Sequence, residues 1–388
     1  MDTRGARPRN GPAGGPETAT QGGDVSVIGG AVAQVLGPAD GGIRSHVRAL
    51  VPRLEHLGVP APVFAPMELG DPVCDVEPVP VPGSGASMGW WSARRSLDAA
   101  LDRCERGPVV LLHAHGLKAA FLCERLRSGQ PLVVSVHNVV LPGPGGTRRR
   151  LAERAAASTW RRADRLVVPS AAVLEDLPSA LHHNARVVAP VVEIAPPVRS
   201  AHEVRRSLGV PDGAPLAVCV ARLHPQKRLD VLAAAWRTVQ RRAPGAWLVV
   251  AGDGPERAAV EAWFAGMTGV VLAGAIAAVS DVLAAADVSV ISSDWEAVPL
   301  VLIESLGVGT PVVCTDVGVA RELLADGRSG RVVDTGDPEA LAEAIGSMLA
   351  VSSSVGGEPR TGGAPIYPVG FEPDQLVRRL VDVYQELL

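Results

Sequence analysis

Two glutamates flank the start of a predicted helix, at a spacing suited to a ligand rich in hydroxyl groups. Glu296 precedes this helix and Glu304 lies more than one turn inside it, in the segment 294–304. Pro299 suits the first helical position and Gly309 suits the residue after the helix. Free amides at such a helix start attract phosphate, while carboxylates accept hydrogen bonds from sugar and ribose hydroxyls. The alternative is an acidic residue followed by an ordinary helix.

Two cations lie in the loop between predicted strand 216–220 and predicted helix 229–243. Arg222 can bind an anion as a fork and Lys227 as a point charge, so both can converge on one phosphate. Lys227 is one of only two lysines in the chain, which argues weakly against generic surface charge. The neighbouring Arg228 is predicted to face solvent. Solvated loop charge is the alternative for the other two cations.

Paired glycines follow one predicted strand and precede one predicted helix. Gly252 and Gly254 come after strand 247–251 and suit a tight turn close to a ligand or to another stretch of backbone. Gly41 and Gly42 open a helix, where a phosphate or sugar could approach the backbone. No Gly-x-Gly-x-x-Gly pattern occurs, so a dinucleotide site is disfavoured. Plain turns are the alternative at both places.

Three histidines lie at the carboxyl ends of predicted strands, where ligand sites of α/β proteins gather. His113 and His115 follow strand 109–112, and His137 follows strand 132–136. A lone histidine is more often structural, but three at such positions favour a functional role for at least one. No carboxylate or cysteine completes a convincing metal site with them, so no metal is predicted.

Short apolar strands alternate with helical patterns along the chain, and the alternation occurs twice around a proline-rich seam at 189–203. Strands without polar alternation are typical of parallel sheets buried on both faces. The predicted fold is therefore α/β, with two Rossmann-like, doubly wound parallel-sheet domains facing across a cleft. The remaining predicted strands are 25–29, 166–168, 186–188, 270–272, 288–291 and 311–315. The remaining predicted helices are 43–57, 147–165, 256–266, 299–308 and 338–350.

The chain divides into four predicted parts. Residues 1–23 are predicted to be a disordered tail, 24–195 an N-terminal Rossmann-like domain and 196–365 a C-terminal Rossmann-like domain. Residues 366–388 contain a final amphipathic helix, preceded by a predicted loop at 352–368. This division predicts one ligand for each domain, both inside the cleft.

Composition excludes several classes of protein. A net charge of −4 gives no sign of nucleic-acid binding, and 47% hydrophobic residues argue against overall disorder. The five scattered cysteines, without a signal peptide or an apolar stretch of membrane-spanning length, predict a cytoplasmic protein. Peripheral contact with an anionic membrane is predicted through helix 147–165, where Arg150, Arg154, Arg161 and Arg165 would share one side. A solvated face is the alternative.

Together these segments resemble the retaining family-four glycosyltransferases, also called glycosyl transferases group 1, which have the GT-B fold. The resemblance spans residues 24–388 and is strongest from 216 to 335. It rests on paired glutamates, an Arg–Lys pair, a Gly-Asp-Gly turn, a glycine pair at the first helix and an N-domain histidine. These features match Glu296 and Glu304, Arg222 and Lys227, residues 251–255, Gly41 and Gly42, and His137. The resemblance implies that 24–195 is the acceptor-side domain and 196–365 the donor-binding domain. The ending 383–388 resembles the family's last helix, so the helix in 366–388 is expected to cross back to the N-terminal domain.

The resemblance implies transfer of a sugar from a UDP- or GDP-linked donor to a glycan, a lipid or a small molecule, without a metal. Arg222 and Lys227 would neutralise the leaving diphosphate. Glu304 would hold the ribose, Glu296 the transferred sugar, and His137 the sugar or the bond being cleaved. Further donor contacts are expected at Gly252, Gly254, Val298 and Leu300, and acceptor or phosphate contacts at Gly41, Gly42, Arg44 and His115.

Other functions fit the same pattern. A nucleotide-sugar epimerase would act without an acceptor, and a glycoside phosphorylase would depend on phosphate. A non-catalytic partner protein would bind the donor without turnover.

Overall fold

The computed structural model describes residues 28–38, 41–66, 76–81, 89–124, 126, 129–137, 147–355 and 364–388, with the backbone alone at 147–153 and 352–355. The predicted tail at 1–23 and Cys74 lie outside these residues. Among the described cysteines, Cys123, Cys219 and Cys314 are buried free thiols, and Cys104 is a partly buried one.

The N-terminal domain is built on a sheet of seven parallel strands in the order β3-β2-β1-β4-β5-β6-β7. The strands are β1 (Ala31–Leu36), β2 (Val63–Ala65), β3 (Val76–Pro78), β4 (Val109–His115), β5 (Leu132–Ser135), β6 (Arg165–Val168) and β7 (Ala185–Val187). The helices are α1 (Gly42–His56), α2 (Gly89–Asp102), α3 (Leu117–Cys123), α4 (Thr147–Trp160), α5 (Ala171–Asp176) and the 3-10 helix η2 (Ser179–Asn184).

The C-terminal domain is built on a sheet of six parallel strands in the order β10-β9-β8-β11-β12-β13. The strands are β8 (Leu216–Val220), β9 (Trp247–Ala251), β10 (Val270–Gly274), β11 (Val288–Ile291), β12 (Val312–Thr315) and β13 (Gly330–Val333). The helices are α6 (Ala201–Ser207), η3 (Pro225–Lys227), α7 (Leu229–Arg242), α8 (Arg257–Phe264), α9 (Val279–Ala284), α10 (Leu300–Gly307), α11 (Ala320–Leu323) and α12 (Pro338–Val355).

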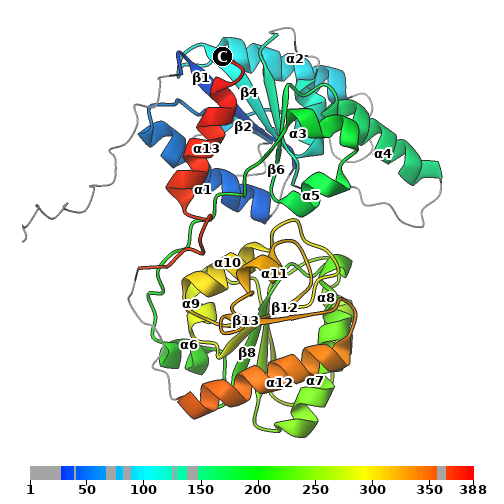
Figure 1. Cartoon of the computed structure of the whole chain (residues 1–388), viewed down its shortest axis with the longest axis vertical. Helices are drawn as coiled ribbons and strands as arrows, with labels where there is room; N and C mark the ends of the chain where they lie inside the picture. Colours follow the sequence, from blue (N-terminus) through cyan, green and yellow to red (C-terminus); the bar gives the residue numbers. More distant parts are fainter. Residues whose placement is uncertain are drawn as a thin grey trace, which may run out of the picture.

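The central strands are apolar because both faces of each sheet are covered by helices. Every residue of β1, β5 and β11 is buried, as expected for parallel strands between two helical layers. The two sheets form separate bodies stacked along the long axis of the molecule (Figure 1). The prediction of two Rossmann-like parallel-sheet domains is therefore confirmed.

The last helix, α13 (Pro373–Gln385), packs against the N-terminal sheet although the chain reaches it from the C-terminal domain (Figure 1). Leu376, Leu380 and Tyr384 of this helix share one apolar cluster with Val32 of β1 and Leu50 of α1. Two segments therefore cross between the domains. They meet where the Tyr367 hydroxyl accepts a hydrogen bond from the Ile194 amide at 3.1 Å.

Several predicted boundaries are wrong. The first described strand occupies Ala31–Leu36, where the buried apolar run pairs with β4; of the strand predicted at 25–29, residues 25–27 lie outside the described residues, and Ile28 and Gly29 are not in a strand. Strands β2, β3 and β13, of three or four residues each, were not predicted. Helix α12 continues to Val355, into the region expected to be a loop.

The helix predicted at 147–165 ends at Trp160, which removes Arg161 and Arg165 from it. The chain turns there because the backbone N–H of Asp164 donates to Leu132, and its carboxylate accepts the Leu132 N–H at 2.8 Å. Arg165 begins β6 and pairs with Glu386 at 2.9 Å. The predicted face of four arginines therefore does not form on one helix.

Candidate active site

A cleft of about 990 Å³ lies between the two domains, at the carboxyl ends of their strands. Its C-terminal wall comes from the loops after β8, β9, β10 and β11 and from the start of α10. Its N-terminal wall comes from the start of α1 and the loop after β5. The lining residues that the sequence predicted are Gly41, Gly42, His137, Arg222, Lys227, Gly252, Gly254, Glu296, Val298, Leu300 and Glu304.

The two predicted cations reach this cleft but have different surroundings. Arg222 is exposed, and among the described residues its guanidinium has no hydrogen-bond or ion-pair partner. Lys227 instead forms an ion pair with Glu296, whose Oε1 also accepts a hydrogen bond from the Ser293 hydroxyl at 2.7 Å. Arg222 can therefore bind an anionic ligand directly, whereas Lys227 would first have to leave its ion pair with Glu296.

Arg228 does not simply face solvent, as the sequence predicted. Its guanidinium bridges Asp230 at 2.9 Å and Asp294 at 2.8 Å, and its side chain is 31% exposed. Both carboxylates raise the pKa of Arg228. Because Asp294 precedes Glu296 by two residues, this bridge holds the glutamate loop against the start of α7.

Glu304 lies one turn inside α10 and is partly buried. Among the described residues its carboxylate has no hydrogen-bond or ion-pair partner, and burial raises its pKa to about 7. Pro299 is the N-cap of α10, with a backbone ψ of 102°, and not its first helical residue as predicted. Gly309 follows the helix with a positive φ of 82°, as predicted.

The two glycine pairs serve different purposes. A Cβ on Gly252 would lie 1.8 Å from the Ala221 carbonyl oxygen, and one on Gly254 would lie 2.4 Å from that of Leu223. These glycines therefore allow close approach of another backbone, which was one of the two predicted alternatives. A Cβ on Gly42 would instead meet Leu300 of the opposite domain at 3.2 Å. The start of α1 thus touches the start of α10 across the cleft.

The N-terminal wall carries a buried cluster of four histidines. His137 is partly buried at the cleft, while His46, His113 and His115 are nearly inaccessible. Burial lowers the pKa of His46 to about 4 and that of His137 to about 3, and holds the pKa values of the other two well below the ordinary value. All four rings are therefore neutral at pH 7.

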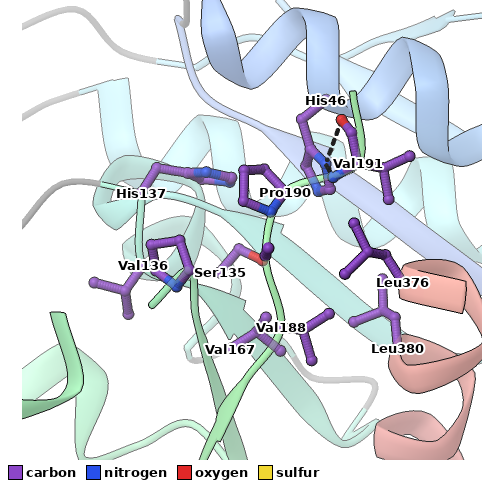
Figure 2. Close-up of a pocket in the computed structure, with 12 residues that line it drawn as sticks. His46, Ser135, Val136, His137, Val167, Val188, Pro190, Val191, Leu376 and Leu380 are labelled. Carbon is purple, nitrogen blue, oxygen red and sulfur yellow. Dashed lines mark hydrogen bonds between the residues drawn. The ribbon is translucent and has the colours of Figure 1, made fainter. Parts of the chain in front are cut away.

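Hydrogen bonds tie these rings to three other elements. His113 contacts the hydroxyls of Tyr384 and Ser135, each at 2.8 Å, so α13 reaches into the cluster. The Val191 amide donates to His46 Nδ1 at 2.8 Å, beside a small cavity of about 20 Å³ that α13 closes with Leu376 and Leu380 (Figure 2).

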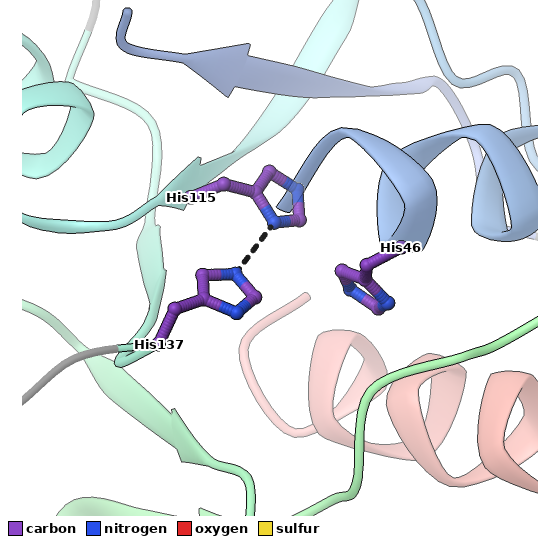
Figure 3. Close-up of side chains that lie close together, drawn as sticks. All are labelled: His46, His115 and His137. Carbon is purple, nitrogen blue, oxygen red and sulfur yellow. Dashed lines mark hydrogen bonds between the residues drawn. The ribbon is translucent and has the colours of Figure 1, made fainter. Parts of the chain in front are cut away.

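His46, His115 and His137 also form a triangle in which one ring nitrogen of each lies within 4.8 Å of the others (Figure 3). Three imidazoles can hold a transition metal. Here, however, His46 Nδ1 lies 2.8 Å from the Val191 amide nitrogen and 3.4 Å from the Val191 carbonyl oxygen. The shorter contact makes Nδ1 an acceptor, so the proton of that neutral ring is on Nε2, which then has no free lone pair. We therefore assign no metal to this triangle.

Two predicted site residues do not line the cleft. His115 is 2% exposed and reaches the site only through His137, at 3.4 Å. Arg44 is half-buried in the first turn of α1.

Ser293 and Gln34 were not predicted, although each carried a signal in the sequence. Ser293 is the second residue after the carboxyl end of β11. Gln34 is the single polar residue of β1, which was placed elsewhere.

Two facing Rossmann-like domains around a polar cleft define the GT-B fold. The Anabaena protein HepE, solved with UDP and glucose, has this fold with a TM-score of 0.73 at 17% identity, over 91% of this chain and 99% of that one. The sequence then gives the family. The chain belongs to the glycosyltransferases, because residues 41–191 match the Glycosyl transferase 4-like domain and residues 214–350 match Glycosyl transferases group 1.

Two curated relatives are similar over much of the chain. The GDP-mannose-dependent alpha-mannosyltransferase of Mycobacterium tuberculosis is 33% identical over 61% of this chain and 62% of its own length. The 2-deoxystreptamine N-acetyl-D-glucosaminyltransferase of Streptomyces fradiae is 32% identical over 68% of each chain. The match thus covers less than two thirds of the first of these relatives. No described helix is both long and apolar enough to cross a membrane.

Proposed function

We propose that this protein transfers a sugar from a nucleoside diphosphate donor to an acceptor hydroxyl, with retention of anomeric configuration and without a metal. The observation that carries the proposal is the C-terminal wall. There Arg222, Lys227 and the start of α10 lie in one cleft with Glu296 and Glu304. Cations and free helix amides fit a diphosphate, and carboxylates fit its hydroxylated ends.

Arg222 and Lys227 stabilise the leaving diphosphate in this proposal. Negative charge develops on the phosphate oxygen as the glycosidic bond breaks, so fixed cations lower the barrier most at that moment. Their charge replaces that of a divalent ion. Lys227 moves from Glu296 to the phosphate when the donor binds, which frees Glu296 to accept hydrogen bonds from the transferred sugar.

Glu304 holds the ribose hydroxyls. Its carboxylate lies at the cleft without another partner among the described residues, so two donating hydroxyls would relieve the cost of its burial. Gly252 and Gly254 shape the adjoining loop, while Val298 and Leu300 carry the backbone that faces the phosphates.

The acceptor enters along the N-terminal wall, beside Gly41, Gly42 and His137. The described residues that line this wall are uncharged, which suits a neutral hydroxyl nucleophile. Retention then follows from attack on the face that the diphosphate leaves, with a phosphate oxygen taking the proton. Both relatives named above are described as transferring a sugar, which supports this assignment for the chain.

Thermal shift with UDP, GDP, ADP and dTDP, each with and without EDTA, tests donor binding and metal independence together. Stabilisation by one nucleotide that survives EDTA is expected, since a ligand that binds the folded state raises its stability. No stabilisation by any nucleotide would reject the proposal.

Turnover of the matching nucleotide sugar then separates the other functions. Epimerisation without an acceptor, or phosphate-dependent release of a sugar phosphate, would indicate a different enzyme. Binding without any transfer would indicate a partner protein. The anomeric configuration of the product, read by NMR, decides between retention and inversion.

Contact with an anionic membrane through residues 147–165 stays a prediction, although the four arginines that motivated it do not share one helix. Sedimentation with anionic and with neutral vesicles tests it, and equal binding to both would reject it.

A further inference from the structure

We propose that Gln34 and His115 are positioning residues that fix the proton of His137 on Nε2, so that its Nδ1 offers a lone pair to a hydroxyl in the cleft. This role in catalysis rests on the proposed transfer function. The proton arrangement itself does not, because it follows from hydrogen bonds inside the N-terminal domain.

The Val32 backbone carbonyl sets the direction of a series of hydrogen bonds that runs through Gln34 and His115 to His137. The Gln34 side-chain Nε2 donates to the Val32 carbonyl oxygen at 3.1 Å. A carbonyl can only accept, so this contact fixes which end of the Gln34 amide is nitrogen. Gln34 Oε1 therefore faces His115, at 3.0 Å from its Nε2.

The same matching of donors to acceptors fixes which nitrogen is protonated in the His115 and His137 rings. Gln34 Oε1 can only accept, so the neutral His115 ring carries its proton on Nε2 and a lone pair on Nδ1. His115 Nδ1 lies 3.4 Å from His137 Nε2, which must then carry the proton of His137 (Figure 3). Nδ1 of His137 is left unprotonated, and among the described residues it has no hydrogen-bond partner.

The surroundings keep this arrangement neutral. His46 of α1 packs against both His115 and His137. His113 of β4 packs against His115, and Tyr384 of α13 packs against His113. All are buried, and none carries charge at pH 7. An ordinary surface histidine would exchange its proton between both nitrogens, whereas His137 holds it on one.

Nitrogen NMR of histidine-labelled full-length protein, without nucleotide, tests the proton arrangement directly. Protonated and unprotonated ring nitrogens resonate far apart, and a His137→Gln variant assigns the signals among the nine histidines. We expect Nε2–H for both His115 and His137 throughout pH 6 to 8. A proton on His137 Nδ1 would overturn the proposal whatever the protein transfers.

Substitution of Gln34 tests the positioning role. Gln34→Leu should let His137 populate both tautomers and should lower kcat/KM by about 3- to 10-fold, the range for one hydrogen bond. Ser135→Ala is the matched control, because Ser135 is equally buried but bonds to His113 instead. It should leave the His137 tautomer unchanged. An unchanged tautomer in Gln34→Leu, or a changed tautomer with normal kcat/KM, would reject the role.

Gln34→Glu keeps the proposal testable if the leucine variant does not fold. While protonated, the introduced carboxyl can still donate to Val32 and accept from His115, so the His137 tautomer should match the wild type. Once ionised, it favours a doubly protonated His115, and the His137 proton should move to Nδ1. A tautomer that does not change as the carboxyl titrates would contradict the proposed relay.

Discussion

The two walls of the cleft differ in how they handle charge. The C-terminal wall presents Arg222, Lys227, Glu296 and Glu304, whereas the described residues lining the N-terminal wall carry no formal charge. His137 on that wall and the three histidines behind it, His46, His113 and His115, are neutral, because burial lowers the pKa of each. Such a division suits a reaction between a charged donor on one side and a neutral hydroxyl on the other.

The two walls also differ in whether their side chains can change protonation state near pH 7. Glu304 has its pKa raised into the neutral range, so the C-terminal wall can change charge near pH 7. His46 and His137 have theirs lowered to about 4 and about 3, so the N-terminal wall cannot. Substitutions and changes of pH should therefore affect the two walls in different ways.

The largest expected effect is removal of a cation from the C-terminal wall. Arg222→Ala or Lys227→Ala should lower kcat/KM by about 10²-fold or more, as for loss of one fixed donor in an oxyanion site. Steady-state kinetics with the cognate donor measures it. Arg242→Ala, an exposed arginine at the end of α7, is the control and should be near normal. Normal turnover in both cleft variants would reject their assigned role.

Acid should destabilise the N-terminal domain more than the C-terminal domain. Histidines with lowered folded pKa values contribute full stability above the unfolded value of 6.5 and lose it as pH falls towards about 4 for His46 and about 3 for His137. Each such histidine can lower the free energy of unfolding by about 1.4 kcal/mol per pH unit in that window. Hydrogen exchange should show β4 and β5 losing protection between pH 6.5 and 5 while β8 and β11 keep it. Equal loss in both sheets would contradict this comparison.

Nucleotide affinity should depend on Glu304. Its folded pKa of about 7 means that the carboxylate which accepts ribose hydroxyls is present above pH 7 and is lost as pH falls below it. Affinity should fall by up to about tenfold per pH unit from pH 7 to pH 6. Calorimetry measures this, and Glu304→Gln should flatten the profile. A wild-type profile that is already flat would separate Glu304 from the nucleotide.

The smallest effect is expected where the walls touch. Gly42→Ala would place a methyl group 3.2 Å from Leu300, so the domains should close slightly less well and KM should rise by less than about tenfold. Leu300→Ala in the same chain should restore closure, and the double-mutant cycle measures the coupling. Additive effects would show that the contact does not matter for closure.

Sequence reasoning located cleft-lining residues most completely in the C-terminal domain. Arg222, Lys227, Gly252 and Glu296 each follow a parallel strand within seven residues, and such strand ends share one edge of the sheet. It failed for Pro299, whose place at the helix start differs by one position. One backbone torsion decides that difference, and composition does not report it.

The order of strands and motifs along the sequence thus determined the fold class and most of the charged residues of the C-terminal wall, because each motif lies on its own strand and loop. Tertiary packing alone decided the histidine wall. The His113 side chain contacts Tyr384, 271 residues away, and His46 accepts a hydrogen bond from the Val191 amide, 145 residues away. Whether buried rings share protons depends on register and distance between separate elements, and neither is written in any single stretch of sequence.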